Sequence, residues 1–389
     1  MKKFRLNFIN SFSIITVIII FSCSNSSKQA DPEFTIRTIN VGKGPGSIES
    51  GDFNKDGFAD IAVANSSDSS VTILLGDGKG NFTTADGSPF FANRFPNDIA
   101  IADINKDGNL DIGIANTDVS FLTILSGNGK GQFQQPARSP FIVHSKPHTH
   151  GIAIGDFNGD GNLDLATDSW GENRVVIIFS DGKMNFGNET FYKVGNRPYQ
   201  RLRAADINKD GKPDLVTTNL EGNNATVLLG EGNGNFKEAE GSPYPSGDAP
   251  FGVAIGDVNG DGNPDLAIAN SPTITAESKG KDGLWILLGD GSGKFSSLKG
   301  SPFKTGRSPS RVAIGDLNGD GMNDIAVTNY NDKSISIFFM GKNSVLNTKT
   351  IGVGSHPDGI AIQDMNNDKK NDILLSNYDD NNVMILLAR

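Results

Sequence analysis

The chain has 389 residues, of which 36% are apolar, 47 are glycine and 24 are phenylalanine. This composition is enough for a large hydrophobic core and indicates many tight turns between short strands, and no stretch reads as a long helix. The formal net charge of −10 argues against nucleic acid as a partner, because proteins that bind phosphate normally carry a basic surface.

The N-terminal residues have the pattern of an export signal. A basic start (residues 2–5) precedes an apolar run over 14–21, which is too short to span a bilayer. Cys23 follows and is the only cysteine, so it cannot form an internal disulfide. The residues before it resemble a bacterial lipobox, which predicts a signal peptide over 1–22, a lipidated Cys23 and a flexible tether over 23–32. The chain would then be exported and held on a bacterial envelope membrane. The alternative is a plain signal peptide with an incidental cysteine.

An extended segment comes next, and seven repeats follow it. Residues 33–41 (EFTIRTINV) read as a strand, and after them one nonamer recurs seven times at intervals of 48 to 59 residues. Around each nonamer the same layout returns: an apolar strand, the nonamer, a second strand, a polar turn, a third strand, and a Gly-rich hairpin leading to a fourth. Four short strands per period of about 50 residues are typical of a propeller blade. We therefore predict an all-β, seven-bladed β-propeller of four-stranded antiparallel blades over residues 33–389.

The two ends of the chain predict how the ring closes. The seventh repeat stops after its third strand, at VMILLAR, and nothing remains to make a fourth. Residues 33–41 lie at the other end of the chain with no partner of their own. Pairing this strand with the last blade would remove the open sheet edges, so we expect an N-terminal strand to complete the seventh blade.

The nonamers have the residue types of a Ca²⁺ loop. Carboxylate and amide oxygens at positions 1, 3, 5 and 9, with a backbone carbonyl at position 7, are hard ligands at a spacing that a tight turn can wrap around Ca²⁺. Glycine at position 6 permits the sharp turn. The predicted ligands are Asp52, Asn54, Asp56, Phe58 and Asp60; Asp103, Asn105, Asp107, Asn109 and Asp111; Asp156, Asn158, Asp160, Asn162 and Asp164; Asp206, Asn208, Asp210, Lys212 and Asp214; Asp257, Asn259, Asp261, Asn263 and Asp265; Asp316, Asn318, Asp320, Met322 and Asp324; and Asp364, Asn366, Asp368, Lys370 and Asp372.

Up to seven Ca²⁺ would offset the acidity of the chain. In the seventh loop Lys369 stands where the other loops have glycine, so we expect that loop to be distorted and its metal weak. The alternative for any one loop is an Asx turn, in which the side chains cap their own backbone without metal. Carboxylates crowded in one turn repel each other unless a cation lies between them, and this favours metal for the set.

The nonamers and their flanking strands, such as GIAIGD and DLAIAN, resemble the FG-GAP repeats of integrin α-subunit propellers and the related VCBS repeats of bacterial surface proteins. The resemblance covers residues 33–389. It implies Ca²⁺ in the loops between the first two strands of each blade, and a ligand on the opposite face.

The third and fourth repeats depart from the regular spacing and gather unusual side chains. The candidate ligand residues are His148, Trp170, Arg197, Tyr199 and Arg201. Aromatic rings beside arginines are typical of hot spots for a protein or an acidic glycan, and we expect them to be exposed on the face away from the nonamers. The alternative is that they are solvated or wedge-filling residues of longer loops. The long turn 270–283 is a second candidate.

No nucleophile, zinc-protease or P-loop motif occurs in the sequence, so we predict a binding protein and not an enzyme. The interpretation is a lipid-anchored, monomeric, Ca²⁺-binding adhesion module for a protein or glycan partner. The alternative is a carbohydrate-active protein, either a lectin or a polysaccharide lyase, on the same scaffold.

Overall fold

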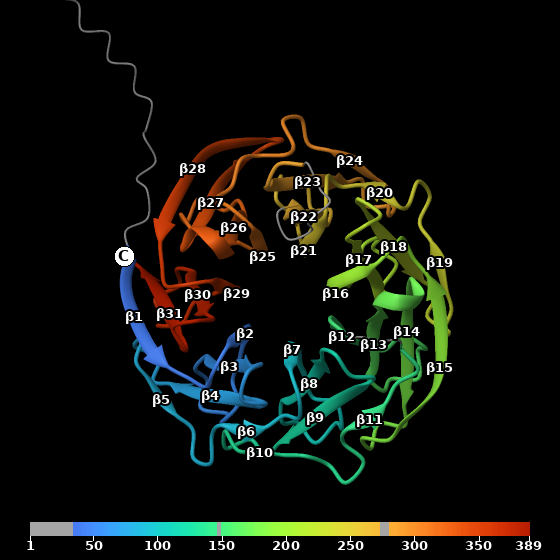
Figure 1. Cartoon of the computed structure of the whole chain (residues 1–389), viewed down its shortest axis with the longest axis vertical. Coiled ribbons are helices and arrows are strands. Elements are labelled where there is room, and N and C mark those ends of the chain that lie inside the picture. Colours follow the sequence, from blue (N-terminus) through green and yellow to red (C-terminus); the bar gives the residue numbers. More distant parts are fainter. Residues whose placement is uncertain (1–33, 146–148, 273–279) are drawn as a thin grey trace, which may run out of the picture. The chain divides into compact units, whose positions relative to one another are not determined.

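The computed structural model describes residues 34–145, 149–272 and 280–389. Over these residues the strands form seven antiparallel sheets that stand around a central axis like the blades of a propeller (Figure 1). The predicted all-β, seven-bladed propeller is therefore confirmed. No described helix is long and apolar enough to cross a membrane.

The blades follow one another in chain order. Blade 1 comprises β2 (Pro45–Gly51), β3 (Asp60–Asn65), β4 (Ser70–Gly76) and β5 (Phe82–Thr84), with β6 (Phe90–Phe91) beside β4. Blade 2 comprises β7 (Pro96–Ala102), β8 (Asp111–Asn116), β9 (Phe121–Gly127) and β10 (Phe133–Gln134), with β11 (Phe141–Ile142) beside β9. Blade 3 comprises β12 (Ile152–Gly155), β13 (Asp164–Ser169), β14 (Arg174–Ser180) and β15 (Phe186–Lys193), and the short 3-10 helix η1 (Trp170–Glu172) follows β13. Blade 4 comprises β16 (Pro198–Ala205), β17 (Asp214–Asn219), β18 (Asn224–Gly230) and β19 (Phe236–Glu238), with β20 (Tyr244–Pro245) beside β18.

The remaining blades repeat the pattern. Blade 5 comprises β21 (Pro250–Gly256), β22 (Asp265–Asn270), β23 (Gly283–Gly289) and β24 (Phe295–Ser297). Blade 6 comprises β25 (Pro309–Gly315), β26 (Asp324–Asn329), β27 (Ser334–Gly341) and β28 (Ser344–Gly352), and the 3-10 helix η3 (Tyr330–Asp332) follows β26. Blade 7 comprises β29 (Pro357–Gln363), β30 (Asp372–Asn377), β31 (Asn382–Ala388) and, from the other end of the chain, β1 (Phe34–Asn40).

The core lies between neighbouring blades. The second strand of each blade is six residues long and fully buried, as in DIAVAN of β3 and DLAIAN of β22. Such strands are covered on both faces, which is why they read as nearly continuous apolar runs and do not alternate with polar residues. The apolar clusters accordingly join side chains of two adjacent blades; one of them packs Ile73 of blade 1 with Ile114 of blade 2.

The ring closes as the sequence predicts. Strand β1 pairs antiparallel with β31 in unbroken register from Phe34 opposite Ala388 to Asn40 opposite Asn382. The seventh blade thus has four strands, of which the first in the chain is the outermost. Closure by this clasp pairs the edge of β31, which would otherwise be open.

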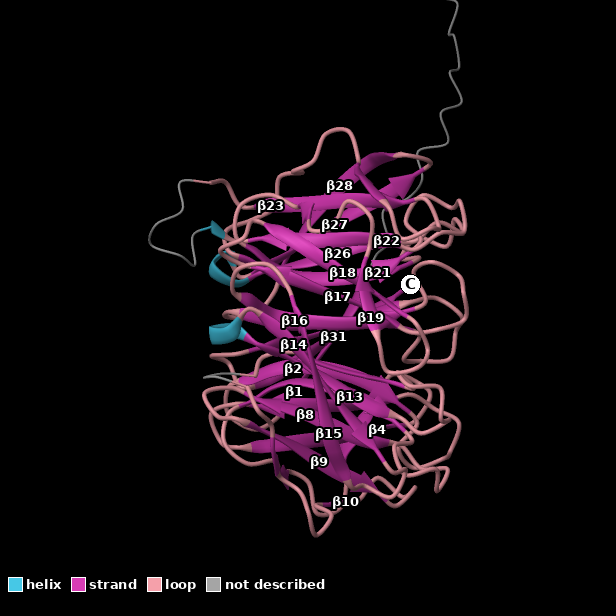
Figure 2. Ribbon diagram, turned by 90° about the vertical axis from the view of Figure 1, so that its right-hand side faces the viewer, coloured by secondary structure: helices cyan, strands magenta, loops and turns pink. Residues whose placement is uncertain are grey.

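The connections divide the surface into two faces, seen edge-on in Figure 2. Each nonamer joins a first strand to a second strand, so all seven lie on one face, which we call the loop face. The turns before the first strands and the turns between second and third strands lie on the other, which we call the turn face. Helices η1 and η3 mark the turn face, on the left of Figure 2.

Some predicted features lie outside the described residues. These are the signal peptide, Cys23 with its tether, His148, and residues 273–279 of the long turn.

Candidate functional site

The nonamers of the loop face share one hydrogen-bond pattern. In the first loop both carboxylate oxygens of Asp52 accept from the loop backbone, at 3.1 Å from Asp56 N and 2.9 Å from Gly57 N. Asn54 Oδ1 also accepts from Asp56 N, and Asp56 Oδ1 accepts from Phe58 N. In all seven loops the backbone N–H of the sixth residue donates to Oδ2 of the first aspartate, at 2.7–2.9 Å. The oxygens at positions 1, 3 and 5 therefore converge on the inside of each turn.

The aspartate at the ninth position of each nonamer has a structural role that the sequence analysis did not predict. Asp60 is fully buried, and its two oxygens accept from Phe53 N and Gly76 N, both at 2.8 Å. Equivalent bonds occur for Asp111, Asp164, Asp214, Asp265, Asp324 and Asp372. Each of these carboxylates therefore fastens its loop to the end of the third strand of its own blade.

Burial makes these ninth carboxylates unusually basic. Desolvation, assisted by the neighbouring carboxylates Asp56 and Asp52, raises the pKa of Asp60 to about 6, although the two backbone donors oppose the shift. Desolvation likewise raises the pKa of Asp111, Asp164, Asp265 and Asp372 to about 6, that of Asp324 to about 7, and that of Asp214 in the same direction. Like charges placed this close favour either a proton or a bound cation.

The seventh loop is not distorted, contrary to the expectation from its lysine. Lys369 adopts a left-handed backbone with φ 70°, close to φ 85° at the equivalent Gly57, and its N–H donates to Asp364 Oδ2 at 2.7 Å. The three carboxylates and the asparagine keep the loop hydrogen bonds, so the lysine takes on the conformation of glycine. A side chain in that region costs about 1–2 kcal/mol.

The donor set of each loop fits a hard cation. Carboxylate oxygens, an amide oxygen and a carbonyl are the ligands that Ca²⁺ prefers, and a carboxylate that accepts two N–H bonds still has lone pairs to offer. Among the described residues, no three acidic, histidine or cysteine side chains form a ready-made metal centre. A cation in these loops would therefore depend on asparagine and backbone oxygens as well as on the carboxylates.

Lysines from neighbouring repeats offset part of the acidity of the loop face. Lys106, at position 4 of the second loop, donates from Nζ to Asn162 Oδ1 of the third loop at 2.7 Å. The ammonium group of Lys55 lies beside Gly108 in the same way. Adjacent loops are thus linked side to side as well as through their blades.

On the turn face the structure brings several predicted ligand residues together. The guanidinium of Arg197 lies over the ring of Trp170, 3.8 Å from its centroid, and is also 3.4 Å from Glu221 Oε1. Tyr199 packs against His150 and Phe251, with ring centroids 4.2 and 5.3 Å apart. Trp170, Arg197 and Tyr199 are all partly exposed. We call these three residues the aromatic–arginine patch.

A buried pair underlies the patch. His150 is almost fully buried, and its Nδ1 is 3.2 Å from Asp168 Oδ2. Asp168 Oδ1 accepts from the backbone N–H of His150 and of Gly151. Other blades have alanine, serine or threonine where blade 3 has Asp168. The pair fixes the ring on which Tyr199 rests.

Arg201 is not an exposed ligand residue, which corrects the prediction from sequence. Only 4% of it is exposed, and its Nη1 is 2.5 Å from Asp98 Oδ1. Asp98 is fully buried and also accepts from Ser47 Oγ at 3.1 Å and from Arg203 Nη1 at 3.2 Å. Arg201 therefore belongs to a charged network at the propeller axis.

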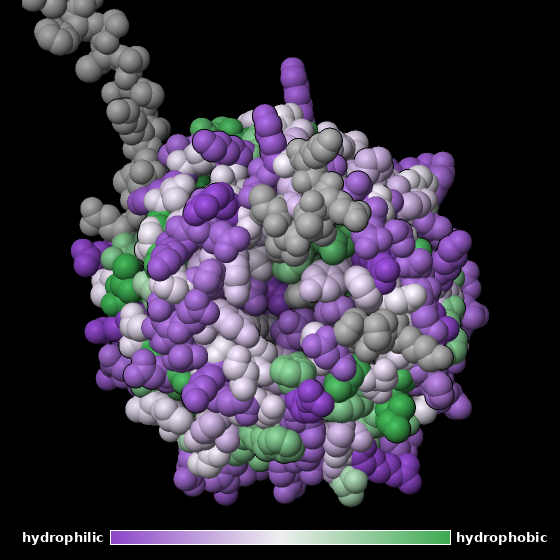
Figure 3. All heavy atoms as spheres, in the orientation of Figure 1, coloured by the Kyte–Doolittle hydropathy of each residue, from purple (hydrophilic) through white to green (hydrophobic). Residues whose placement is uncertain are grey.

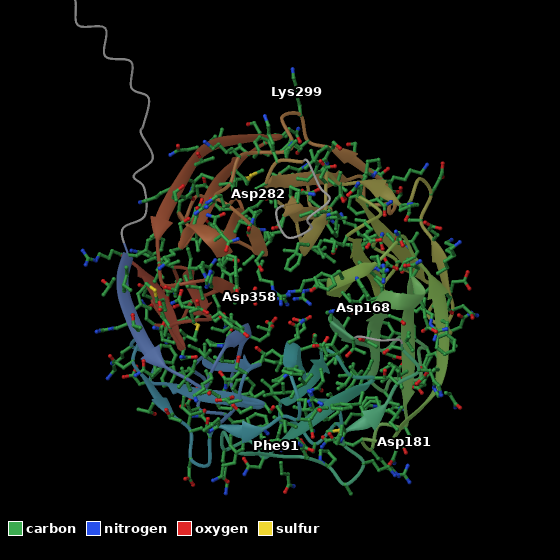
Figure 4. The ribbon with its side chains drawn as sticks, viewed as in Figure 1. Phe91, Asp168, Asp181, Asp282, Lys299 and Asp358 are labelled. Atoms are coloured by element: carbon green, nitrogen blue, oxygen red, sulfur yellow. The ribbon has the colours of Figure 1, made fainter. Side chains whose placement is uncertain are left out.

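A second pair extends this network around the axis. The buried Arg311 has its Nε 3.3 Å from Asp358 Oδ1, and burial raises the pKa of Glu49 to about 7 although Arg203 opposes the shift. Figure 4 shows Asp358 at the central opening with Asp168 across from it, and Figure 3 shows the hollow at the axis with largely hydrophilic walls. Charged side chains thus line the centre of the ring.

Glycines at the same repeat position explain how these large side chains fit. Five residues before the nonamer, blades 3, 5 and 7 have glycine, whereas blades 4 and 6 have Arg201 and Arg311. A Cβ on Gly252 would come within 2.3 Å of Ser310 O, and one on Gly151 within 2.5 Å of Leu202 N. The small residues let adjacent inner strands approach, and this alternation is the signal in the sequence that could have placed Arg201 at the axis.

Comparison with known proteins supports the fold and identifies the family. None of the curated proteins matches the sequence. Among solved structures, a virginiamycin B lyase from Staphylococcus aureus matches with 15% identity and TM-score 0.58, over 91% of this chain and 99% of that one. A hydrazine synthase from Kuenenia stuttgartiensis matches with 13% identity and TM-score 0.60, over 88% and 95%. A lectin from Agrocybe aegerita that recognises non-reducing terminal N-acetylglucosamine matches with 18% identity and TM-score 0.53, over 89% and 96%.

At these identities the structural likeness shows the fold alone. The repeats themselves are more specific: residues 52–114, 107–167, 206–268, 274–327 and 316–375 match the FG-GAP-like repeat, and together they cover well over half of the chain. The chain belongs to the FG-GAP-like repeat family.

Proposed function

We propose that the chain is an exported, lipid-anchored, Ca²⁺-binding module whose turn face binds a protein or glycan partner. The observation that carries the proposal is the contrast between the two faces. The loop face repeats one set of oxygen donors seven times, whereas the turn face is irregular where the aromatic–arginine patch lies. Function in repeat scaffolds concentrates where loops depart from the repeat.

Ca²⁺ in the nonamers would neutralise the crowded carboxylates and hold each loop in its turn. Asp52, Asn54, Asp56 and Asp60, with the carbonyl of Phe58, would hold it in the first loop, and the corresponding residues would do so in the others. The chain would use the metal to stiffen the ring and not to perform chemistry.

The aromatic–arginine patch has the composition of a binding hot spot. Trp170 offers a flat apolar surface, and Arg197 stacks on it while its guanidinium edge can still donate to a carboxylate or carbonyl. The stack fixes both side chains before binding, so little conformational entropy is lost when a partner binds.

The test compares two variants on the same face. Once a partner has been isolated in millimolar Ca²⁺ from envelope or host extract and identified, Trp170→Ala with Arg197→Ala should weaken its binding by about 2 kcal/mol or more. Arg307→Ala is the matched control, because Arg307 occupies the same repeat position in blade 6 and is exposed, but pairs with Asp332 instead of an aromatic ring. Equal binding by the double variant and the control would contradict the proposal.

A further inference from the structure

A cavity lies on the loop face of blade 3, away from the aromatic–arginine patch. Its volume is about 420 Å³, within the size range of small-ligand sites. It is an open depression between the third nonamer and the hairpin that joins β14 to β15, and Figure 4 shows Asp181 of that hairpin near the outer rim. The residues that matter to its chemistry are Asn158, Asp160, Phe179, Asp181, Asn185 and Phe186.

The fourth strand of blade 3 is longer than those of blades 1, 2, 4 and 5. Strand β15 has eight residues, whereas the fourth strands of blades 1, 2, 4 and 5 have two or three. The pairing of β14 with β15 shifts register between Ile178 and Phe179, at the edge of the cavity. Met184 also replaces the glycine that the hairpins of those four blades have at this position. The turn itself keeps the backbone conformation of its counterparts, with Met184 at φ 62° and Gly80 at φ 76°, so the difference from those four blades lies in the long fourth strand.

Packing holds the two phenyl rings of the cavity in place. Phe186 stacks on Phe141 of blade 2, with ring centroids 4.8 Å apart and planes 16° apart. Phe179 lies against Gly234 in the hairpin of blade 4. The ring is so close that a Cβ added to this glycine would lie 2.9 Å from it. Both side chains are partly exposed, so each offers part of a ring to the cavity.

The polar groups of the cavity are acids and amides. Asp181 Oδ1 accepts from Lys183 N at 2.8 Å and its Oδ2 accepts from Asn185 Nδ2 at 2.7 Å. The bond from Asn185 is the main reason why the pKa of Asp181 is lowered, so the group stays ionised. Asp160 Oδ2 accepts from Asn158 Nδ2 at 3.2 Å. None of the nine described residues that line the cavity is lysine, arginine or histidine.

This chemistry selects the class of ligand. No described side chain that lines the cavity is cationic and Asp181 is anionic, so the side chains disfavour phosphates, sulfates and carboxylates. Ionised carboxylates accept from hydroxyls, amides both donate and accept, and phenyl rings cover apolar C–H surface. We propose that the cavity binds a neutral saccharide unit, whose hydroxyls contact Asp181 and Asn185 while its C–H face lies against Phe179 and Phe186. A small organic cation would use the same acids and rings, and its binding is one of the outcomes of the test.

The test uses neutral monosaccharides as probes. Methyl glycosides of glucose, galactose, mannose and N-acetylglucosamine are screened by saturation-transfer NMR against the full-length protein in millimolar Ca²⁺, and the affinity of those that bind is measured by calorimetry. Glucuronate and spermidine are the anionic and cationic probes. At least one neutral glycoside should bind, and glucuronate should bind more weakly than its neutral counterpart.

Paired variants show where the sugar binds. Asn185→Ala should weaken binding about tenfold or more, because it removes a donor to the ligand and to Asp181. Asn81→Ala in blade 1 is the matched control: Asn81 Nδ2 donates to Asp77 Oδ2 at 2.9 Å in the equivalent hairpin, but lines no part of this cavity. Its affinity for the sugar should equal that of the wild type.

Several outcomes would overturn the inference: no neutral glycoside binds, spermidine alone binds, or Asn185→Ala and Asn81→Ala have the same effect. The inference stands apart from the proposed function of the turn face. If Trp170→Ala abolishes sugar binding while Asn185→Ala does not, the saccharide site belongs to the turn face and the cavity proposal fails alone.

Discussion

Replacing Asp98 with alanine should destabilise the propeller more than any surface substitution. The fully buried carboxylate of Asp98, in blade 2, joins side chains from two other blades, since it accepts from Ser47 of blade 1 and from Arg201 and Arg203 of blade 4. Asp98→Ala leaves the guanidinium of Arg201, whose side chain is 5% exposed, without its carboxylate in a site that water scarcely reaches.

The contacts of Asp98 and Arg201 predict how much each substitution lowers the free energy of unfolding. An uncompensated buried charge costs about 3–5 kcal/mol, so Asp98→Ala should lower the free energy of unfolding by that amount. Arg201→Ala should cost less, about 1.5–3 kcal/mol, because Asp98 keeps Arg203 and Ser47 as partners. The double variant should cost less than the sum of the two, because the second substitution removes the charge that the first left unpaired.

Urea unfolding followed by tryptophan fluorescence measures all three variants. Asp86→Ala is the control, since Asp86 is exposed and, among the described residues, accepts a single side-chain bond, from Gln132. Its substitution should change stability by less than about 0.5 kcal/mol. If Asp98→Ala costs no more than Asp86→Ala, or if the double variant is strictly additive, the axial network does not stabilise the ring as described.

Three further predictions concern closure, pH and the seventh loop. A chain that starts at residue 43 lacks β1 and should lose cooperative unfolding or become insoluble, whereas removal of residues 24–32 should leave the melting temperature unchanged; equal melting of both would refute the clasp. In chelator, the free energy of unfolding should fall between about pH 4 and pH 7: carboxyls with a raised folded pKa, such as Asp60 and Asp324, contribute stability that is complete below about pH 4 and is lost once the pH passes their folded pKa of about 6 and about 7. Saturating Ca²⁺ should flatten that profile, and a profile that is the same with and without Ca²⁺ would contradict it. Lys369→Gly should stabilise the protein by about 1 kcal/mol in thermal unfolding by relieving a left-handed lysine, and a loss of stability would show that the lysine side chain contributes more than the strain costs.

The fold and the closure could be predicted because the sequence repeats itself. A nonamer at a fixed position in each period sets the blade, and a seventh repeat that ends one strand short requires a strand from elsewhere, which β1 supplies. The sequence predicts that Trp170 and Arg197 lie on the same face, but not that the guanidinium stacks on the indole ring. The pairing of β14 with β15 and its shifted register, which shape the blade 3 cavity, depend on side-chain packing that no periodic pattern shows.

Arg201 shows where the sequence reading failed. The sequence groups it with Arg197 because both belong to the same irregular repeat, but Arg197 lies in the turn just before β16, whereas Arg201 lies within that strand, which leads from the turn face to the loop face. Arg197 remains at the surface, whereas Arg201 occupies a position where three other blades have glycine. Lys369 is a second case: a lysine at the glycine position predicts a distorted loop, but the bonds that Asp364 and Asp368 make to the backbone hold the turn together.

The central claim is that Ca²⁺ in the nonamers stabilises the propeller. The most direct measurement is calorimetric titration of the chelator-treated protein with Ca²⁺, followed by thermal melts in chelator and in millimolar Ca²⁺. We predict several Ca²⁺ bound per chain and a higher melting temperature with Ca²⁺, because a ligand that binds only the folded state stabilises it. No heat of binding together with identical melting temperatures in the two conditions would contradict the account and leave the nonamers as Asx turns that cap their own backbone.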